Sequence, residues 1–475
     1  MGNGVSSGME IFAEGELEAE MQRLGGSGDS SVKKLLGKGY RDVVQLIIRP
    51  KRAEYSLQAL GPSTLRLAEL KPSGSNKELN PAATNEDDEF RIVRRRDFDV
   101  LNDRKLRVVC SHWQLYEDAD SAAPLATPCL VYLHSNIGSR VDALNMRDLA
   151  LRRGFSVLAL DFCGSGLSDG VYVTMGWNEA RDLNAVLQEL ENDPTVTEFA
   201  IYAHSMGTFP AVVNVAARSL VADKKLLAKM ETLPHELRAA NANVLAKPIK
   251  ALVFDGGYAT MAQVNEGLLR AMQEEGFPVP KSVMKLAMAA IQKSAKKRAE
   301  VDLDLLRPID FVGACSIPAL FIAGENDRYV LPQQSEELVS KYPGPASLLR
   351  VKGEHYTPRD PAVYAQAVDF FRPVVRERAA QVELDVNKIA DRVVAIVQVE
   401  EVDVLGRRDL RVAASVLVYK VVLLTLAPLE LVSPASSLLS PSSTSAADVT
   451  LPRDEVVTGA TRQAVDATLD PLLAR

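Results

Sequence analysis

The stretch EFAIYAHSMGTFPAVV at residues 198–213 decides the fold of this chain. It begins as an apolar run typical of a buried strand and continues as a helix, with Ser205 between them. Ala203 and Gly207 are small, which lets the backbone turn sharply from strand to helix and expose the serine hydroxyl at the end of a sheet. The common pattern for such a turn is G-x-S-x-G, and here alanine replaces the first glycine. We interpret Ser205 as a nucleophile, with a helix-capping serine as the alternative.

Strands and helices alternate along the chain after Pro128. Six apolar runs have the length of strands and are separated by helical patterns, so both faces of each strand are expected to be covered. This pattern predicts an α/β fold with a mostly parallel central sheet and helices on both faces. An antiparallel hairpin at 90–100 and 105–116 precedes it. The six predicted strands lie at 129–134, 155–161, 198–204, 249–255, 319–324 and 347–353.

Two further polar residues complete a candidate catalytic set, because each follows one of the last two predicted strands. Asp327 comes after ALFIAG, and His355 comes after SLLRVKG. In hydrolases with a strand-to-helix serine turn, the chain order is serine, acid, histidine, each after a later strand. Glu325 and Asp255 are the other candidate acids. We prefer Asp327 and expect Asp255 to have a structural role.

The residue types of this set suit acyl transfer. Ser205 must lose a proton as it attacks a carbonyl carbon, and His355 can take this proton and later give it to the leaving group. Asp327 would orient the imidazole and stabilise its charged form. Two backbone N–H groups must then bind the oxyanion, and we predict those of Met206 and Asn136. This chemistry needs neither a cofactor nor a metal ion, and we predict none.

These motifs together resemble the α/β-hydrolase superfamily. The resemblance covers about residues 44–374 and implies an α/β-hydrolase fold with helical cap insertions and a triad at Ser205, Asp327 and His355. The motifs are most similar to the serine aminopeptidase-like branch, which also holds monoglyceride lipase-like enzymes, and within it to a eukaryotic group found in plants and protists. The branch name implies peptidase activity, but the branch includes lipases and esterases. The residues that carry the resemblance are PCLVYLHSNIGSR, LDFCGSGLSDG, YVTMGWNEARDL, AHSMG, GENDRYV and GEHYTPRD, with QLIIRPKRAEY upstream.

Composition and pattern divide the chain into three parts. Residues 1–38 are rich in Gly, Ser and Glu and predict a flexible arm. Residues 39–378 form the predicted hydrolase domain. Two of its connections, near 218–248 and 257–308, are long enough to form caps beyond the carboxyl ends of the strands. Residues 379–475 form an extension that we predict to be partly disordered.

Two segments raise the question of membrane contact. The stretch KSVMKLAMAAIQKSAKKRAE at 281–300 predicts a basic amphipathic helix, which can lie on a membrane but is more commonly a lid with a solvated basic face. The apolar stretch at 410–432 is broken by Lys420 and Pro428. This interruption favours a docked helix or strand pair over a transmembrane span.

The first residues fit the N-myristoylation pattern M-G-x-x-x-[ST], with Gly2 as the acceptor and Ser6 at the required position. A serine also occurs there by chance, so acylation of Gly2 is a hypothesis. A single acyl chain attaches only marginally, and we therefore expect reversible association with the cytosolic face of a membrane. The start lacks the features of a secretory signal, and the four cysteines show no disulfide or zinc spacing. We predict a cytoplasmic protein.

Four functions compete for this sequence. The favoured one is a serine hydrolase that cleaves an acyl ester, thioester or lipid ester through an acyl-enzyme. A peptidase would need acidic side chains to hold a free amine, for which Glu266, Glu274 and Glu275 are candidates. A non-catalytic scaffold would not need the complete triad. A dinucleotide-binding enzyme is disfavoured by the stretch DFCGSGLSDG at 161–170. There Asp169 replaces the third glycine of the dinucleotide-binding pattern G-x-G-x-x-G. The net charge of −7 gives no basic field for nucleic acid, so we expect a small-molecule or acylated substrate.

Overall fold

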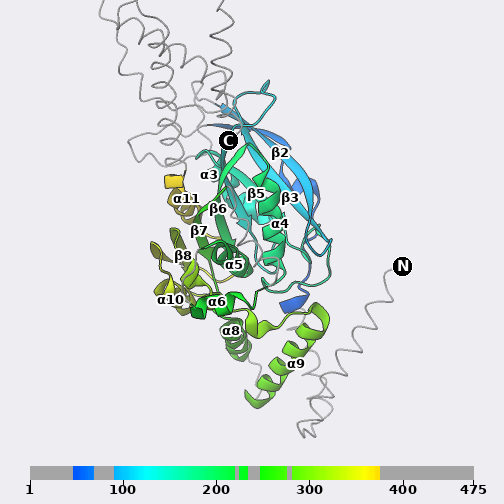
Figure 1. The fold of residues 1–475 in the computed structure, drawn as a ribbon, viewed down its shortest axis with the longest axis vertical. Coiled ribbons are helices and arrows are strands. Elements are labelled where there is room, and N and C mark those ends of the chain that lie inside the picture. The colour runs from blue at the N-terminus through cyan, green and yellow to red at the C-terminus, as the bar shows by residue number, and fades with distance from the viewer. Residues whose placement is uncertain (1–46, 69–89, 220–223, 234–246, 275–280, 375–475) are drawn as a thin grey trace, which may run out of the picture. The chain divides into compact units, whose positions relative to one another are not determined.

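The computed structural model describes residues 47–68, 90–219, 224–233, 247–274 and 281–374 (Figure 1). Three of the sequence predictions lie outside these residues: the arm at 1–38 with the acylation site Gly2, the extension at 379–475, and the apolar stretch at 410–432. The cap predicted near 218–248 is described only in part.

In the described residues the central sheet has nine strands in the order β1-β2-β3-β5-β4-β6-β7-β8-β9. The pairs from β1 to β3 and the β3–β5 pair are antiparallel, and all later pairs are parallel. This mostly parallel sheet with an antiparallel edge has the α/β-hydrolase fold, so the predicted fold class is confirmed. The strands are β1 (Thr64–Ala68), β2 (Phe90–Leu101), β3 (Arg107–Tyr116), β4 (Thr127–Leu133), β5 (Ser156–Asp161), β6 (Val196–His204), β7 (Ile249–Asp255), β8 (Ala319–Gly324) and β9 (Ala346–Val351).

The connections between the strands are mostly helical. The α-helices are α3 (Leu144–Leu151), α4 (Glu179–Glu191), α5 (Thr208–Arg218), α6 (Lys224–Met230), α8 (Met261–Glu274), α9 (Lys281–Ala299), α10 (Pro332–Lys341) and α11 (Pro361–Phe370). Short 3-10 helices are η1 (Leu57–Leu60), η2 (Arg140–Ala143), η3 (Ser205–Gly207), η4 (Leu303–Leu305), η5 (Pro308–Asp310) and η6 (Val312–Ala314).

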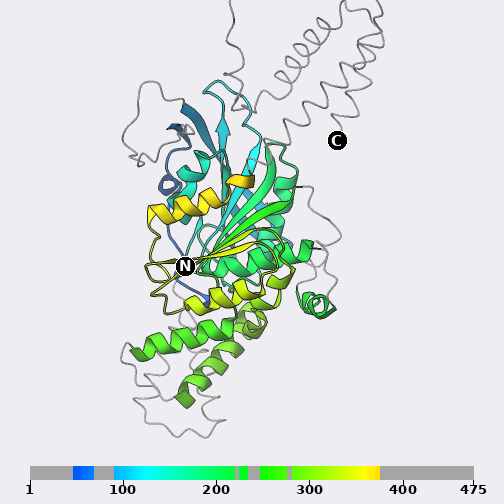
Figure 2. The same cartoon turned by 90° about the vertical axis from the view of Figure 1, so that its left-hand side faces the viewer.

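Both faces of the sheet are buried along strands β4 to β8, as their apolar runs require, whereas in the edge strand β9 only Val351 is buried. Along β6, Ile201 and Ala203 belong to one core, whereas Ala200 and Tyr202 belong to the other. Helices α4, α5 and α10 contribute side chains to the first core, and α3 and α11 pack together over the second (Figures 1 and 2). Because a strand alternates its side chains between faces, this packing fixes the register of β6 and holds its carboxyl end in place.

The long connections contain the remaining helices. Helix α6 lies between α5 and β7, and helices α8 and α9 lie between β7 and β8, where both contact η4. The segment at 281–300, expected to be a basic helix, forms α9. No helix among the residues that the structure describes combines the length and the apolar character needed to cross a bilayer.

Candidate active site

Ser205 occupies a strained turn between β6 and α5. Its backbone is left-handed, with φ of +50°, a region that residues other than glycine rarely adopt. A Cβ atom at Gly207 would lie 2.8 Å from the Cβ of Leu133 on the neighbouring β4, so this position has room only for glycine. Ala203 still lies in β6 and has no left-handed backbone, so glycine is not required there, and its small side chain is fully buried.

The structure brings Ser205, His355 and Asp327 into one hydrogen-bonded chain. The Oγ of Ser205 lies 2.7 Å from the Nε2 of His355, and the Nδ1 of His355 lies 2.6 Å from Oδ2 of Asp327. All three side chains are buried. The carboxylate can only accept, so Nδ1 carries the proton and Nε2 is left to accept the proton of Ser205. This is the geometry of a general base aimed at a nucleophile.

Backbone groups hold the carboxylate of Asp327 in this orientation. Its second oxygen, Oδ1, accepts hydrogen bonds from the backbone N–H groups of Tyr329 at 3.0 Å and Val330 at 2.8 Å. Glu325, the nearest alternative acid in the sequence, is exposed. Asp255 instead forms an ion pair with Arg359, whose Nη2 lies 2.8 Å from Oδ1 of Asp255.

The imidazole of His355 lies close to two neighbouring groups. Gly256 has a left-handed φ of +61°, and a Cβ atom there would lie 3.3 Å from both Cε1 and Nδ1 of His355. The Nε2–H of His204 donates to the backbone carbonyl of His355 at 3.3 Å. Burial lowers the pKa of His204, so this second histidine is neutral and adds no positive charge beside His355 at neutral pH.

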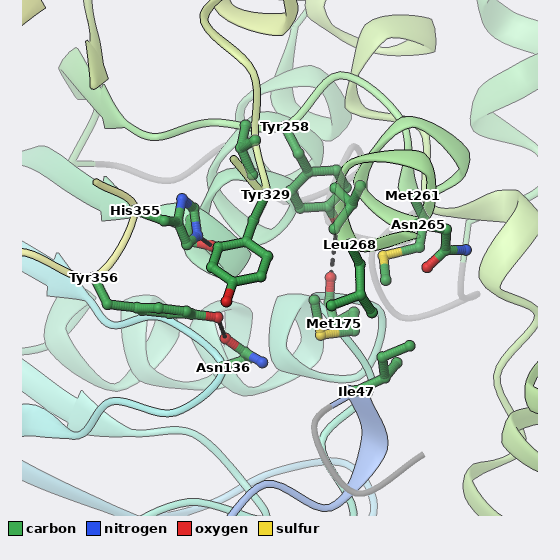
Figure 3. A pocket seen from close by; sticks show the side chains of 13 residues that line it. Ile47, Asn136, Met175, Tyr258, Met261, Asn265, Leu268, Tyr329, His355 and Tyr356 are labelled. Atoms are coloured by element: carbon green, nitrogen blue, oxygen red, sulfur yellow. Dashed lines mark hydrogen bonds between the residues drawn. The ribbon is translucent and has the colours of Figure 1, made fainter. Parts of the chain in front are cut away.

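The loop after β4 brings Asn136 to the same cavity as Ser205. His134 fixes this loop, because its Nδ1–H donates to the carbonyl of Ser135 at 2.6 Å and its Nε2 accepts from the N–H of Phe162 at 3.0 Å. The phenol of Tyr356 donates to Oδ1 of Asn136 at 3.0 Å (Figure 3). The loop of the candidate oxyanion donor is thereby tied to the residue that follows His355.

Met206, the other candidate oxyanion donor, is fully buried in η3 directly after Ser205. The first N–H groups of a helix have no preceding carbonyl to bond within the helix. The N–H of Met206 therefore starts the helix that runs on into α5, the position that the fold uses for oxyanion binding.

The cavity over Ser205 is largely apolar. Its walls come from segments far apart in the chain, including Ile47, Met175 and the first turns of α8 (Figure 3). Burial raises the pKa of the Tyr258 and Tyr356 hydroxyls, so both remain protonated donors. The residues that line it are Ile47, Asn136, Met175, Ser205, Tyr258, Met261, Val264, Asn265, Leu268, Tyr329, Val330, His355 and Tyr356.

The glycine-rich segment at 161–170 folds back on Asp161. The carboxylate of Asp161 accepts from the N–H groups of Leu167 and Arg140, both at 2.8 Å. A Cβ at Gly166 would lie 2.2 Å from this carboxylate, so glycine here serves a tight internal turn. The chain then continues to Met175 at the cavity wall. Gly166 packs against this carboxylate and Gly164 against the backbone of Tyr172, so these glycines serve the internal packing of the loop.

Several residues that line the cavity were missed in the sequence analysis. Tyr356 could have been found, because it directly follows His355. Asn265 lies in an amphipathic helix without a motif, and Ile47 lies far upstream of the triad. Their approach to Ser205 depends on tertiary packing.

Comparisons with known proteins found one partial family match and a set of distantly similar solved structures. A family model described as "Serine hydrolase (FSH1)" matches residues 256–367, the part that contains Asp327 and His355. The arrangement is that of a serine hydrolase. No curated protein matches the chain.

Solved structures of two esterases and of a mouse hydrolase-domain protein resemble the chain at low identity. The Pyrococcus furiosus esterase Pf2001 is 16% identical, with a TM-score of 0.41, over 59% of this chain and 93% of that one. An esterase from Exiguobacterium antarcticum is 15% identical, with a TM-score of 0.39, over 58% of this chain and all of that one. Mouse alpha/beta hydrolase domain-containing protein 10 is 13% identical, with a TM-score of 0.37, over 59% of this chain and 99% of that one. At these values the likenesses say nothing about substrate.

Proposed function

We propose that the protein hydrolyses an acyl ester, thioester or lipid ester through an acyl-enzyme on Ser205. The observation that carries this proposal is the continuous hydrogen-bonded chain from Ser205 through His355 to Asp327. A serine hydroxyl is a weak nucleophile without an adjacent base, and this chain supplies both the base and the group that orients it.

In the first half of the reaction, Oγ of Ser205 bonds to the carbonyl carbon while its proton moves to Nε2 of His355. The carbonyl oxygen becomes an oxyanion, for which the N–H groups of Met206 and Asn136 are the proposed donors. The bond from the carbonyl carbon to the leaving oxygen or sulfur then breaks. The leaving group takes the proton from Nε2, and the acyl group stays on Ser205.

In the second half, water replaces the alcohol or thiol. His355 takes a proton from the water as its oxygen attacks the acyl carbon, and the ester bond to Ser205 breaks. The proton passes from Nε2 to Oγ, which releases a carboxylic acid and restores the resting site. Asp327 keeps the imidazole in one tautomer throughout and stabilises the imidazolium.

The lining of the cavity supports an acyl substrate over a peptide with a free amine. None of the described residues that line the cavity is acidic. Of the acids considered for amine binding, Glu266 is exposed, Glu274 lies 3.9 Å from Arg328 with a largely exposed side chain, and Glu275 is not among the described residues. Apolar walls instead suit a hydrocarbon chain.

The test is labelling of the full chain with a fluorophosphonate, which bonds to an activated serine and releases fluoride. We expect labelling of the native protein, none of Ser205→Ala, and at least about a hundredfold slower labelling of His355→Ala because the base is lost. Ser340→Ala, on the exposed face of α10, is the matched serine control and should label normally. A folded native protein without labelling would refute the proposal.

A further inference from the structure

One wall of the cavity carries a buried polar atom that has no partner among the residues that the structure describes. Met261, Val264, Asn265 and Leu268 have the spacing of a single face of α8, and all four line the cavity. Asn265 is the polar member of this set. Its amide oxygen has less than 1 Å² of exposed surface and no hydrogen-bond partner among the described residues. In Figure 3 this oxygen is on the cavity side of the amide, and the nitrogen points away.

A buried acceptor without a donor is unfavourable for folding, because it has lost its hydrogen bond to water. Leucine has nearly the same size and would pack at this position without that loss. A donor on the substrate would give this oxygen the hydrogen bond that it lacks, once the side chains around it move apart to admit the donor.

The wall that carries Asn265 is held against the triad. A Cβ atom at Gly267 would lie 2.4 Å from the backbone oxygen of Tyr329, so α8 packs directly on the loop that follows Asp327. At the start of the helix, the N–H of Met261 donates to the carbonyl of Leu306 at 2.9 Å. The amide of Asn265 therefore has a defined position relative to Ser205.

The two sides of the cavity have different chemistry. His355 must reach the leaving group to protonate it, so the leaving group lies on the side of His355 and Tyr356. Asn265 lies on the opposite side (Figure 3). The part of the substrate that reaches Asn265 is then the acyl chain.

We infer that Asn265 selects acyl chains that carry a hydrogen-bond donor, a hydroxyl or an amide N–H, over plain hydrocarbon chains of equal length. This selection rests on the acyl-enzyme function proposed above. A site with a buried polar group discriminates strongly against an analogue that lacks the matching group, since the analogue leaves the acceptor unpaired.

The experiment compares two fluorophosphonates at each of several chain lengths. In one, the chain on phosphorus ends in a methyl group; in the other, it ends in a hydroxyl. This chain takes the place of the acyl chain, and fluoride takes the place of the leaving group. At the chain length that reaches Asn265, we expect the native protein to react roughly tenfold faster with the hydroxyl-bearing probe.

Variants of Asn265 assign the preference to its amide oxygen. Asn265→Leu and Asn265→Ala should lose the preference, and Asn265→Leu should react faster with the methyl-ended probe. Asn265→Asp keeps an acceptor and should keep the preference for the hydroxyl. Glu266→Gln, an exposed neighbour on the same helix, is the control and should behave as the native protein.

A thermal melt separates selection from a structural role. If Asn265 serves the substrate, Asn265→Leu melts at the same temperature as the native protein or higher, because an unpaired buried acceptor has been removed. A lower melting temperature together with an unchanged probe preference would overturn the inference.

The remaining outcomes are also decisive. Equal rates with both probes at every chain length would refute selection by Asn265 while leaving the hydrolase function intact, because Ser205 would still have reacted. A folded protein that reacts with neither probe would refute both.

Discussion

Asp255 is the last residue of β7, Asp327 lies three residues past the end of the neighbouring parallel strand β8, and both are 3% exposed. Their partners come from one short segment, because His355 binds Asp327 and Arg359 binds Asp255. The two carboxylates lie at the same edge of the sheet and are equally buried. They differ in the group that each one faces.

This difference separates a catalytic from a structural carboxylate. Arginine is always charged, so the Asp255–Arg359 pair exchanges no proton at neutral pH. Burial is the largest influence and raises the pKa of Asp255, but the nearby positive charge, chiefly of Arg359, and the hydrogen bonds from Arg359 and Tyr202 together outweigh it, and the pKa lies below its usual value. His355 can gain and lose a proton, and Asp327 faces the nitrogen opposite the one that serves Ser205. A carboxylate opposite a titratable partner can support catalysis, whereas one opposite a permanent cation stabilises the fold.

The largest effect is expected from Asp327→Asn. The amide would present an N–H to Nδ1 of His355, which favours the tautomer with the proton on Nε2 and leaves Ser205 without a base. We expect kcat to fall roughly 10⁴-fold, with a loss of at most about 1–2 kcal/mol in unfolding free energy. Ester hydrolysis and urea denaturation measure the two quantities. Glu325→Gln, an exposed acid two residues away, is the control, and an equal loss of activity in it would contradict the assignment of Asp327.

Arg359→Leu should lower the stability of the fold, whereas Asp327→Asn mainly lowers kcat. The reason is that Arg359→Leu leaves the buried carboxylate of Asp255 without its ion-pair partner. The side chains of Asp255 and Arg359 are 4% and 2% exposed, and breaking such a pair costs about 3–5 kcal/mol. We expect this loss in urea denaturation. The double variant Asp255→Leu/Arg359→Leu should recover most of it, because no charge remains buried. A double variant as unstable as the single one would show that other bonds matter more than the ion pair: the bond from Arg359 to the carbonyl of Glu354, or the bond from the buried Tyr202 hydroxyl to Asp255 at 2.7 Å.

Gly256 connects the two carboxylate sites, because it follows Asp255 and packs against His355. In Gly256→Ala, a left-handed alanine costs about 1–2 kcal/mol. The new methyl group would also lie 3.3 Å from the imidazole, and we expect a displaced His355 and roughly tenfold lower kcat. Gly313→Ala is the matched control, since a Cβ there meets nothing within 4 Å. Equal activity in the two variants would mean that His355 tolerates displacement.

The sequence contained enough information for the fold and for the three residues that meet at Ser205. Parallel strands end at one edge of a sheet, so a serine, an acid and a histidine after successive apolar runs must approach one another. The strand β1 was not predicted, because TLRLA is five residues long, carries a charge and pairs only with β2 at the edge.

Contacts between distant side chains could not be predicted. The sequence offers Asp255 and Asp327 as buried acids after strands, and only the loop from His355 to Arg359 assigns a partner to each. The bond from Tyr356 to Asn136 joins residues 220 positions apart. Such pairings depend on side-chain directions that follow from packing, which local patterns do not encode.

The smallest expected effect is a pH dependence of the unfolding free energy that comes from Asp255. The pKa of Asp255 is lower in the folded protein than its ordinary value of 3.8. The pair with Arg359 therefore stabilises the fold fully above that pH, and its contribution disappears as the pH falls through the lower, folded pKa. A single proton changes the unfolding free energy by at most about 1.4 kcal/mol per pH unit. We expect the difference in stability between the native protein and Asp255→Asn to narrow below about pH 4, measured by urea denaturation at a series of pH values. Stability curves that stay parallel across this pH range would show that the pKa of Asp255 is not lowered in the folded protein. The contrast between the structural carboxylate Asp255 and the catalytic carboxylate Asp327 would then rest on geometry alone.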